Sequence, residues 1–221
     1  DELISFHLFK EMDQYSRGLQ TVTDDSSMNA MTKNLPVLNM LNTRYVIYPG
    51  KDYELAIPNP QANGNAWFVK NIKTVANADS EIVALYGADT KADAFIQQKN
   101  REGLGATNTY EGEGKIVLKS YQPNNLVYET DTKNKEFAVF SEIYYPKGWN
   151  AYVDGTLSPY MCVDYLLRGM EIPAGQHKIE FKFEPTVYKT GNTIALIGSL
   201  LVLVSVALGF YLSAKKKELI F

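Results

Sequence analysis

The sequence predicts an α+β fold in three parts: a helical or mixed N-terminal part, an antiparallel β-sandwich and one C-terminal transmembrane helix. Three observations favour this fold. Apolar residues recur with helical spacing early in the chain, short strand-like runs separated by turn signals follow, and residues 193–212 carry no charged side chain. We therefore expect a mixed α/β part over 1–110, a sandwich over 111–185, a membrane span over 193–212 and a basic tail over 213–221.

The N-terminal part should begin with three helices. An amphipathic helix over 2–15 has a wide apolar face and should end at Arg17-Gly18. Possible N-caps for a second helix that runs to residue 31 are Asp24, Asp25, Ser26 and Ser27. Pro36 fits the first turn of a third helix that runs to residue 41.

Two strands and a buried segment should follow. The run over 44–48 is β-branched and aromatic and stops at Pro49-Gly50, which predicts a buried strand followed by a turn. Residues 54–57 are a short strand candidate. The apolar triplet Trp67-Phe68-Val69 must also be buried.

Two more helices are expected before the sandwich. Asn77 or Asp79 could cap a helix that runs to Tyr86, and Asp89 could cap another that runs to Gln98. The glycine-rich segment over 102–114 is typical of a loop.

The sandwich is predicted from short apolar runs, of which the last alternates most clearly, with Ile179 and Phe181 on one face and Lys178 and Glu180 on the other. These runs are 116–118, 126–128, 137–145, 149–153, 165–172 and 177–183. The predicted turns between them are Pro146-Lys147-Gly148, Asp154-Gly155, Arg168-Gly169 and Pro173-Ala174-Gly175. Short strands at this spacing indicate an antiparallel sandwich.

Residues 193–212 are the predicted membrane span, because as a helix they rise about 30 Å, the thickness of the hydrocarbon layer. Positive residues beside a span tend to stay cytoplasmic, so Lys215–Phe221 should be cytoplasmic and residues 1–192 should lie on the outer face of a bacterial cytoplasmic membrane. The alternative is a hydrophobic helix that packs inside a soluble oligomer.

Composition excludes several classes of function. The net charge of −3 and a pI near 5.5 argue against binding nucleic acid. The single cysteine, Cys162, cannot form an intrachain disulfide. His7 and His177 have no cysteine or acid at ligand spacing, so we expect no metal site and no cofactor, and no catalytic residue stands out in this chain.

Several blocks, in order, resemble the C-terminal region of the YfhO family of bacterial membrane proteins. In the second half of the chain they are Phe140–Pro146, Gly148–Gly155, Tyr165–Arg168, Ile172–His177 and Phe181–Pro185. Upstream blocks in the same order are Leu41–Ile47, Asn59-Pro60 and Gly64–Val69.

This resemblance implies a polytopic membrane glycosyltransferase of the GT-C type, which moves a sugar from a polyprenyl-phosphate carrier to a cell-envelope acceptor. It implies that the catalytic acid lies on a loop among N-terminal spans outside this chain, which starts at Asp1 without methionine and is expected to be a fragment. The expected partners are the membrane, the N-terminal transmembrane block of the same polypeptide and a glycan or polyprenyl-phosphate sugar.

Aromatic, acidic and basic residues near the predicted turns are candidates for carbohydrate contact, since aromatic faces stack on sugars and charged groups bond hydroxyls or phosphate. These candidates are Trp149, Tyr152, Asp154, Tyr165 and Arg168, with Asn65 and Trp67 as loop candidates. Core and turn roles are the alternative for each of them.

Three functions are consistent with these patterns. The preferred one is a non-catalytic extracytoplasmic domain of a YfhO-like glycosyltransferase that assists substrate binding. The second is a membrane-anchored carbohydrate-binding or adhesion module without enzymatic activity. The third is a structural partner domain for other envelope proteins.

Overall fold

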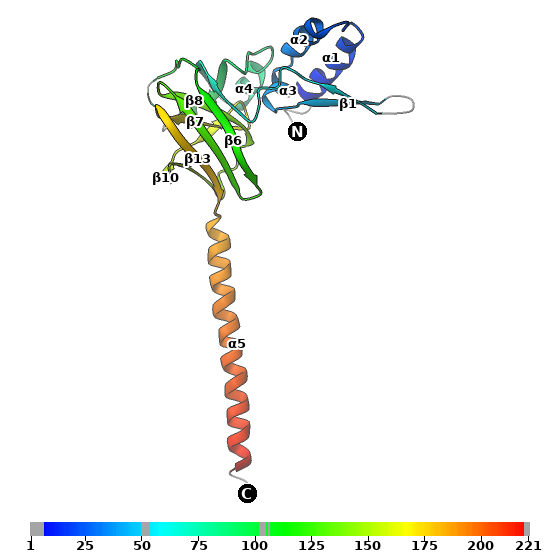
Figure 1. Cartoon of the computed structure of the whole chain (residues 1–221). Helices are drawn as coiled ribbons and strands as arrows, with labels where there is room; N and C mark the ends of the chain where they lie inside the picture. Colours follow the sequence, from blue (N-terminus) through cyan, green and yellow to red (C-terminus); the bar gives the residue numbers. More distant parts are fainter. Residues whose placement is uncertain (1–6, 50–53, 102–104, 106, 219–221) are drawn as a thin grey trace.

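The computed structural model describes residues 7–49, 54–101, 105 and 107–218. A cluster of helices and a hairpin precedes a two-sheet sandwich, and a long helix leaves the sandwich at one end (Figure 1). The predicted α+β architecture is therefore confirmed.

The N-terminal cluster consists of α1 (Phe9–Leu19), α2 (Asp25–Lys33) and α3 (Pro36–Met40). Of the four predicted capping candidates, Asp24 caps α2, because its side chain accepts a hydrogen bond from the Ser27 backbone N–H at 2.8 Å. The prediction that α1 ends at Arg17-Gly18 is wrong: the helix continues to Leu19. A Cβ at Gly18 would collide with the side chain of Met31, so this glycine lets α2 pack closely. Residues 1–6 of that predicted helix lie outside the described residues.

A buried carboxylate joins α1 to α3. Glu11 accepts backbone hydrogen bonds from Val37 N–H at 3.0 Å and Leu38 N–H at 2.9 Å, which are unpaired donors in the first turn of α3. Burial raises the pKa of Glu11 to about 7, although these two hydrogen bonds lower it.

The strands β1 (Tyr45–Pro49) and β2 (Glu54–Pro58) form an antiparallel hairpin. The prediction of a buried strand here is wrong. Val46 is buried, but Tyr45 is 64 % exposed and Ile47 is 63 % exposed, because the sheet has only two strands and no second layer covers its outer face. β-branched and aromatic composition favours a strand without determining its burial.

The sandwich contains a five-stranded sheet in the order β10-β9-β13-β7-β6 and a four-stranded sheet in the order β11-β12-β8-β3, with all pairs antiparallel. Six strands match the predicted runs: β6 (Lys115–Gln122), β7 (Asn125–Thr132), β8 (Glu136–Ile143), β9 (Trp149–Val153), β12 (Leu167–Ile172) and β13 (Gly175–Phe183). The additional strands are β3 (Ala66–Val69), β10 (Thr156–Ser158) and β11 (Met161–Val163). The sandwich thus takes one strand, β3, from before residue 111.

The space between the sheets is filled by an aromatic core. The ring of Phe140 lies 4.9 Å from those of both Tyr128 and Phe181, edge to face in each case, and all three side chains are fully buried. Such pairs are stabilising beyond the area they bury.

A small β-α-β unit covers the other face of the four-stranded sheet. It consists of β4 (Asn71–Val75), α4 (Ala78–Ala84) and β5 (Asp93–Gln97), with β4 and β5 parallel. Of the two predicted capping candidates, Asn77 is the one that caps α4. A second core lies between this unit and the sheet, with Phe95 and Ile96 from β5 packed in the same cluster as Phe137 and Val139 from β8.

The predicted helix over 89–98 is wrong, since β5 occupies its second half. Asp89 does start one turn, in which its carbonyl accepts hydrogen bonds from Ala92 and Asp93 N–H. The turn does not extend into a helix because residues 94–97 are all buried, and pairing with β4 satisfies their backbone groups in an extended conformation.

The predicted turn at Arg168-Gly169 is also wrong, since both residues lie inside β12. The chain turns earlier, at Asp164 and Tyr165, which have positive φ angles of 50° and 73°. Gly169 has another role: a Cβ there would meet the ring of Phe137 at about 2.7 Å. The glycine therefore makes room for a core aromatic.

Buried carboxyl groups join the β-α-β unit to this turn. Asp164 accepts a hydrogen bond from Phe95 N–H at 2.8 Å and donates its own N–H to the Phe95 carbonyl at 2.9 Å. Glu81 of α4 accepts from Tyr165 N–H at 3.0 Å and from the Gln97 amide at 2.6 Å. Burial raises the pKa of Asp164 to about 8 and also raises the pKa of Glu81.

The last element, α5 (Thr186–Glu218), follows β13 after only Glu184 and Pro185. Residues Thr186–Leu212 are long and apolar enough to cross a membrane, and no other helix in the described part of the chain is. Its apolar side chains, from Val187 to Leu212, are exposed around the whole helix, which indicates that lipid surrounds them.

We expect the 221-residue chain to require detergent or lipid to remain monodisperse, because α5 exposes apolar side chains on every face. Size-exclusion chromatography with light scattering measures this. A chain that ends at Pro185 should need no detergent and serves as the control. A monodisperse monomer of the full chain without detergent would contradict the membrane assignment.

The Asp164→Asn variant should make stability less dependent on pH. Because burial raises the pKa of Asp164 from 3.8 to about 8, its favourable contribution is complete below the lower value and is lost as pH rises through the higher one. Asparagine keeps an acceptor for Phe95 N–H and does not ionise. The variant should therefore lose less stability than the wild type between pH 4 and pH 8.

Thermal unfolding in detergent across this pH range measures the effect. Asp79→Asn is a matched control, since Asp79 is an exposed carboxylate on α4. Equal pH dependence of the wild type and Asp164→Asn would contradict the prediction.

Candidate functional site

Two of the predicted site residues, Trp149 and Arg168, lie together inside the sandwich. Arg168 of β12 places its guanidinium carbon 4.4 Å from the centre of the Trp149 ring and 5.0 Å from that of Phe181. The side chain therefore crosses from the four-stranded sheet to the five-stranded sheet, and the stacking joins the two.

Arg168 is only 3 % exposed, so it is not open to a ligand in this conformation. Its Nε donates to the Ile143 carbonyl at 3.0 Å, while its Nη1 has no hydrogen-bond partner among the described residues. Burial lowers the pKa of Arg168, and the nearby carboxylate of Glu142 partly offsets this. The local geometry is that of a cation that holds two sheets together.

Tyr152 lies in a polar cluster close to the start of α5. Its hydroxyl donates to Glu184 Oε2 at 2.6 Å, and the Asn150 amide donates to the same oxygen at 3.1 Å. The ammonium of Lys182 lies 5.0 Å from the centre of the Tyr152 ring. This cluster is a polar, aromatic surface at the end of the sandwich that carries the membrane helix.

The other candidates lie elsewhere. Asp154 is in the predicted hairpin turn, with φ of 50°, and its carboxylate contacts His177 Nδ1 at 2.6 Å and Lys178 N–H at 2.8 Å. Tyr165 packs against the core between the four-stranded sheet and the β-α-β unit. Asn65 accepts a hydrogen bond from the Asn42 amide at 2.8 Å. The structure thus does not gather the predicted residues into one pocket.

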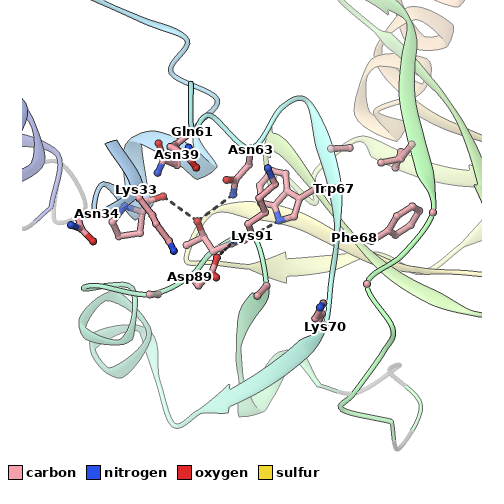
Figure 2. A pocket seen from close by; sticks show the side chains of 18 of the residues that line it. Lys33, Asn34, Asn39, Gln61, Asn63, Trp67, Phe68, Lys70, Asp89 and Lys91 are labelled. Atoms are coloured by element: carbon pink, nitrogen blue, oxygen red, sulfur yellow. Dashed lines mark hydrogen bonds between the residues drawn. The ribbon is translucent and has the colours of Figure 1, made fainter. Parts of the chain in front are cut away.

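Trp67 does line a pocket, a cavity of about 660 Å³ (Figure 2). It is bounded by the ends of α2 and α3, the loop over 87–92, β3 and the start of β6. The cavity therefore lies where the N-terminal helices, the β-α-β unit and the sandwich meet.

The wall of this cavity is held by hydrogen bonds centred on Thr90. Its carbonyl accepts from the Trp67 indole N–H at 2.9 Å, and its hydroxyl accepts from the Asn63 amide at 3.2 Å and donates to the Pro36 carbonyl at 3.3 Å. Trp67 is 5 % exposed, so it forms part of the wall rather than a free stacking surface.

Four exposed lysines line the same cavity, and none forms an ion pair with any residue that the structure describes. They are Lys33, Lys70, Lys91 and Lys115. Among the described residues of the lining, Asp89 is the only acid. Figure 2 shows three of these lysines with Asn63 and Trp67 around the cavity. The excess of positive charge suits an anionic ligand, and the amides can bond hydroxyl groups.

Glycines shape one side of the cavity. Gly112 has φ of +68°, and a Cβ there would meet Cγ of Lys70 at 2.7 Å, so a larger residue would displace that lysine.

Sequence reasoning missed the four lysines because they come from four separate segments. Only Trp67 was found, through its place in a buried run.

No group of three or more histidine, cysteine or acidic side chains could hold a metal ion within the described part of the chain. Burial raises the pKa of the Cys162 thiol to about 12, which is unlike a reactive cysteine. The groups that line the cavity, lysines and side-chain amides, are ones that can bind a ligand.

Substitutions of Arg168 should separate packing from charge. Arg168→Ala should lower the free energy of unfolding by about 2 to 4 kcal/mol, because it removes a buried side chain that stacks on Trp149. Arg168→Met keeps much of the volume and removes a buried charge, so it should cost less. Chemical unfolding in detergent measures both variants. An alanine variant as stable as the wild type would contradict the packing role.

Comparison with known proteins gives one family. Residues 93–195, just under half of the 221-residue chain, match the model of the family described as bacterial membrane protein YfhO. No curated protein and no solved structure matches the chain. The matched region includes β5, every later strand of the sandwich and the first part of α5. Over these residues the chain is similar to the family of the bacterial membrane protein YfhO.

Proposed function

We propose that this chain is the extracytoplasmic part of a YfhO-like polytopic membrane glycosyltransferase of the GT-C type, and that it helps to bind the substrate. The parent enzyme would transfer a sugar from a polyprenyl-phosphate carrier to a cell-envelope acceptor. Its catalytic acid would lie among the N-terminal spans, outside this chain. The family match and the single membrane helix support this proposal.

The observation that carries the binding role is the lysine-lined cavity. An ammonium group binds phosphate or carboxylate oxygens as a point charge, and four lysines around one cavity raise the local concentration of an anion. Neighbouring amides such as those of Gln61 and Asn63 can bond sugar hydroxyls. A glycan that carries phosphate or carboxylate groups has both features.

The position of the cavity favours the acceptor over the lipid-linked donor. Lys115 is at the start of β6, and β6 and β13 run parallel to each other on either side of β7. Because α5 follows the end of β13, the cavity lies about one strand length, roughly 26 Å, from the end nearest the membrane. A polymer that extends away from the membrane reaches this height.

The proposed orientation follows from the lysines after the span. Lys215–Lys217 would stay cytoplasmic, which leaves the cavity on the outer face of the membrane. The acceptor polymer and the sugar-transfer reaction would then lie on the same side.

A second candidate is a membrane-anchored carbohydrate-binding module without enzymatic activity. The cluster of Tyr152, Asn150 and Glu184 favours it, because an aromatic ring beside an amide and a carboxylate is suited to sugar contact. The sequence upstream of Asp1 separates the two candidates. A signal peptide there supports the module, and a set of hydrophobic spans supports the transferase.

Deletion of residues 7–185 from the full-length protein should abolish envelope sugar transfer while the protein still reaches the membrane. Transfer is measured by the sugar content of the cell envelope, and membrane insertion by immunoblotting of membrane fractions. Normal transfer by the deleted protein would contradict the proposal.

The lysine cavity can be tested with a charge-removing triple variant, Lys70→Gln, Lys91→Gln and Lys115→Gln. Binding of inorganic pyrophosphate, measured by titration calorimetry on the detergent-solubilised chain, should weaken about tenfold, since three charge contacts contribute roughly 0.5 kcal/mol each.

The matched control removes the same charge from lysines outside the cavity that are already ion-paired. It carries Lys73→Gln, Lys119→Gln and Lys178→Gln. This variant should bind pyrophosphate as the wild type does. Equal losses in the two variants would show that net charge, and not the cavity, determines binding.

A further inference from the structure

Two segments of the sandwich lie close to the point where α5 begins. They are residues 121–124, at the end of β6, and residues 143–148, after β8, and we call them the membrane-proximal edge. Asn124 accepts a backbone hydrogen bond from Phe183 at 2.9 Å, and Gly148 accepts one from Glu184 at 2.6 Å. A Cβ on Gly148 would approach Pro185 to 3.1 Å, so this loop packs against the last residue before the helix.

This edge exposes large apolar and aromatic side chains. Tyr121 is 63 % exposed, Ile143 is 58 % exposed and Tyr145 is 48 % exposed. In the first turn of α5, Val187 is 81 % exposed and Tyr188 is 69 % exposed. Figure 1 shows the tip of β6 and the end of β13 on the side of the sandwich from which α5 leaves.

The length of α5 gives the height of the edge above the membrane. The uncharged residues 193–212 rise about 30 Å, which matches the hydrocarbon layer. Residues 186–192 add about 10 Å, whereas the headgroup layer on one side is about 5 to 8 Å thick. The edge therefore lies at the outer surface of the headgroups, within reach of a tyrosine side chain.

The spacing of aromatic residues along α5 agrees with this height. Tyr188 and Tyr211 are both exposed and lie about 34 Å apart along the helix axis. Tyrosine is enriched at the two interfaces of a membrane, where its ring is partly in lipid and its hydroxyl in water. Tyr188 then lies at the same interface as the membrane-proximal edge.

We propose that the membrane-proximal edge is a second lipid contact, in which Tyr121, Ile143 and Tyr145 rest among phospholipid headgroups beside the first turn of α5. The exposed Lys147, two residues after Tyr145, can bind a lipid phosphate. The sandwich would be held by α5 and by this edge together, which limits its rotation about the link at Glu184-Pro185.

The contact is assigned to lipid because it is continuous with a helix that is already in lipid. Only two residues separate β13 from α5, so the edge cannot move far from the membrane surface. This inference does not depend on the lysine cavity or on the proposed transferase role, since either could fail without changing the height of the edge.

The test places a nitroxide label at single positions of the full chain in phospholipid nanodiscs, in a Cys162→Ser background. Nickel carried by a chelator on the lipid headgroup relaxes nearby labels. Labels introduced by Tyr121→Cys and Tyr145→Cys should relax several-fold more than a label at Tyr86→Cys. Tyr188→Cys is the positive control within α5.

Tyr86 is a matched control because it is also a tyrosine, is 61 % exposed and follows α4 in the chain. Figure 1 shows α4 at the end of the sandwich opposite to α5. Equal relaxation at residues 86, 121 and 145 would overturn the proposal. So would strong relaxation at Tyr188 alone, which would place only the helix at the headgroups.

A second measurement needs no substitution. The unmodified chain in nanodiscs that contain a lipid with a photoreactive headgroup should form lipid adducts in peptides that cover residues 121–124 and 143–148, and none around residue 86. Cross-links from these peptides to a second copy of the chain, without lipid adducts, would show a protein contact in place of the lipid contact and overturn the proposal.

Discussion

The burial of β8 on both faces is the constraint on which the rest of the structure depends. Phe137 and Val139 point into the core shared with the β-α-β unit, whereas Ala138 and Phe140 point into the core between the two sheets. A strand that alternates between two cores needs a layer on each side. The sandwich could therefore not be complete with two sheets alone, and residues 71–97 provide the third layer.

This third layer also creates the lysine-lined cavity. The N-terminal helices pack beside the β-α-β unit, and Thr90 between them bonds both Pro36 and Trp67. The cavity thus lies where three parts of the chain meet. Its polar wall is held in place because the hydrogen bonds of Thr90 join three different segments. A wall whose segments are already held by hydrogen bonds loses little order when a ligand binds to it.

The predicted site residues show how much local patterns can say about function. The sequence predicts sugar contact for Trp149 and Arg168. They do lie together, but in the interior, where Arg168 stacks on Trp149 and Phe181. The Arg168-Gly169 pair has the composition of a turn, yet it occupies a strand because Phe137 needs the space above Gly169. The same limit applies to Asp89, which starts a single turn that is followed directly by the strand β5.

The sequence by itself determined the features that depend on neighbouring residues: the span in α5, helix starts close to Asp24 and Asn77, and six of the eight strands from residue 115 onward. These follow from side-chain periodicity and short-range hydrogen bonds, which act within one element. Only the tertiary structure decided that Tyr45 and Ile47 of β1 are exposed, that β8 is buried on both faces, and that four lysines line one cavity. Burial and charge clustering depend on contacts between distant segments, and local sequence patterns do not predict those contacts.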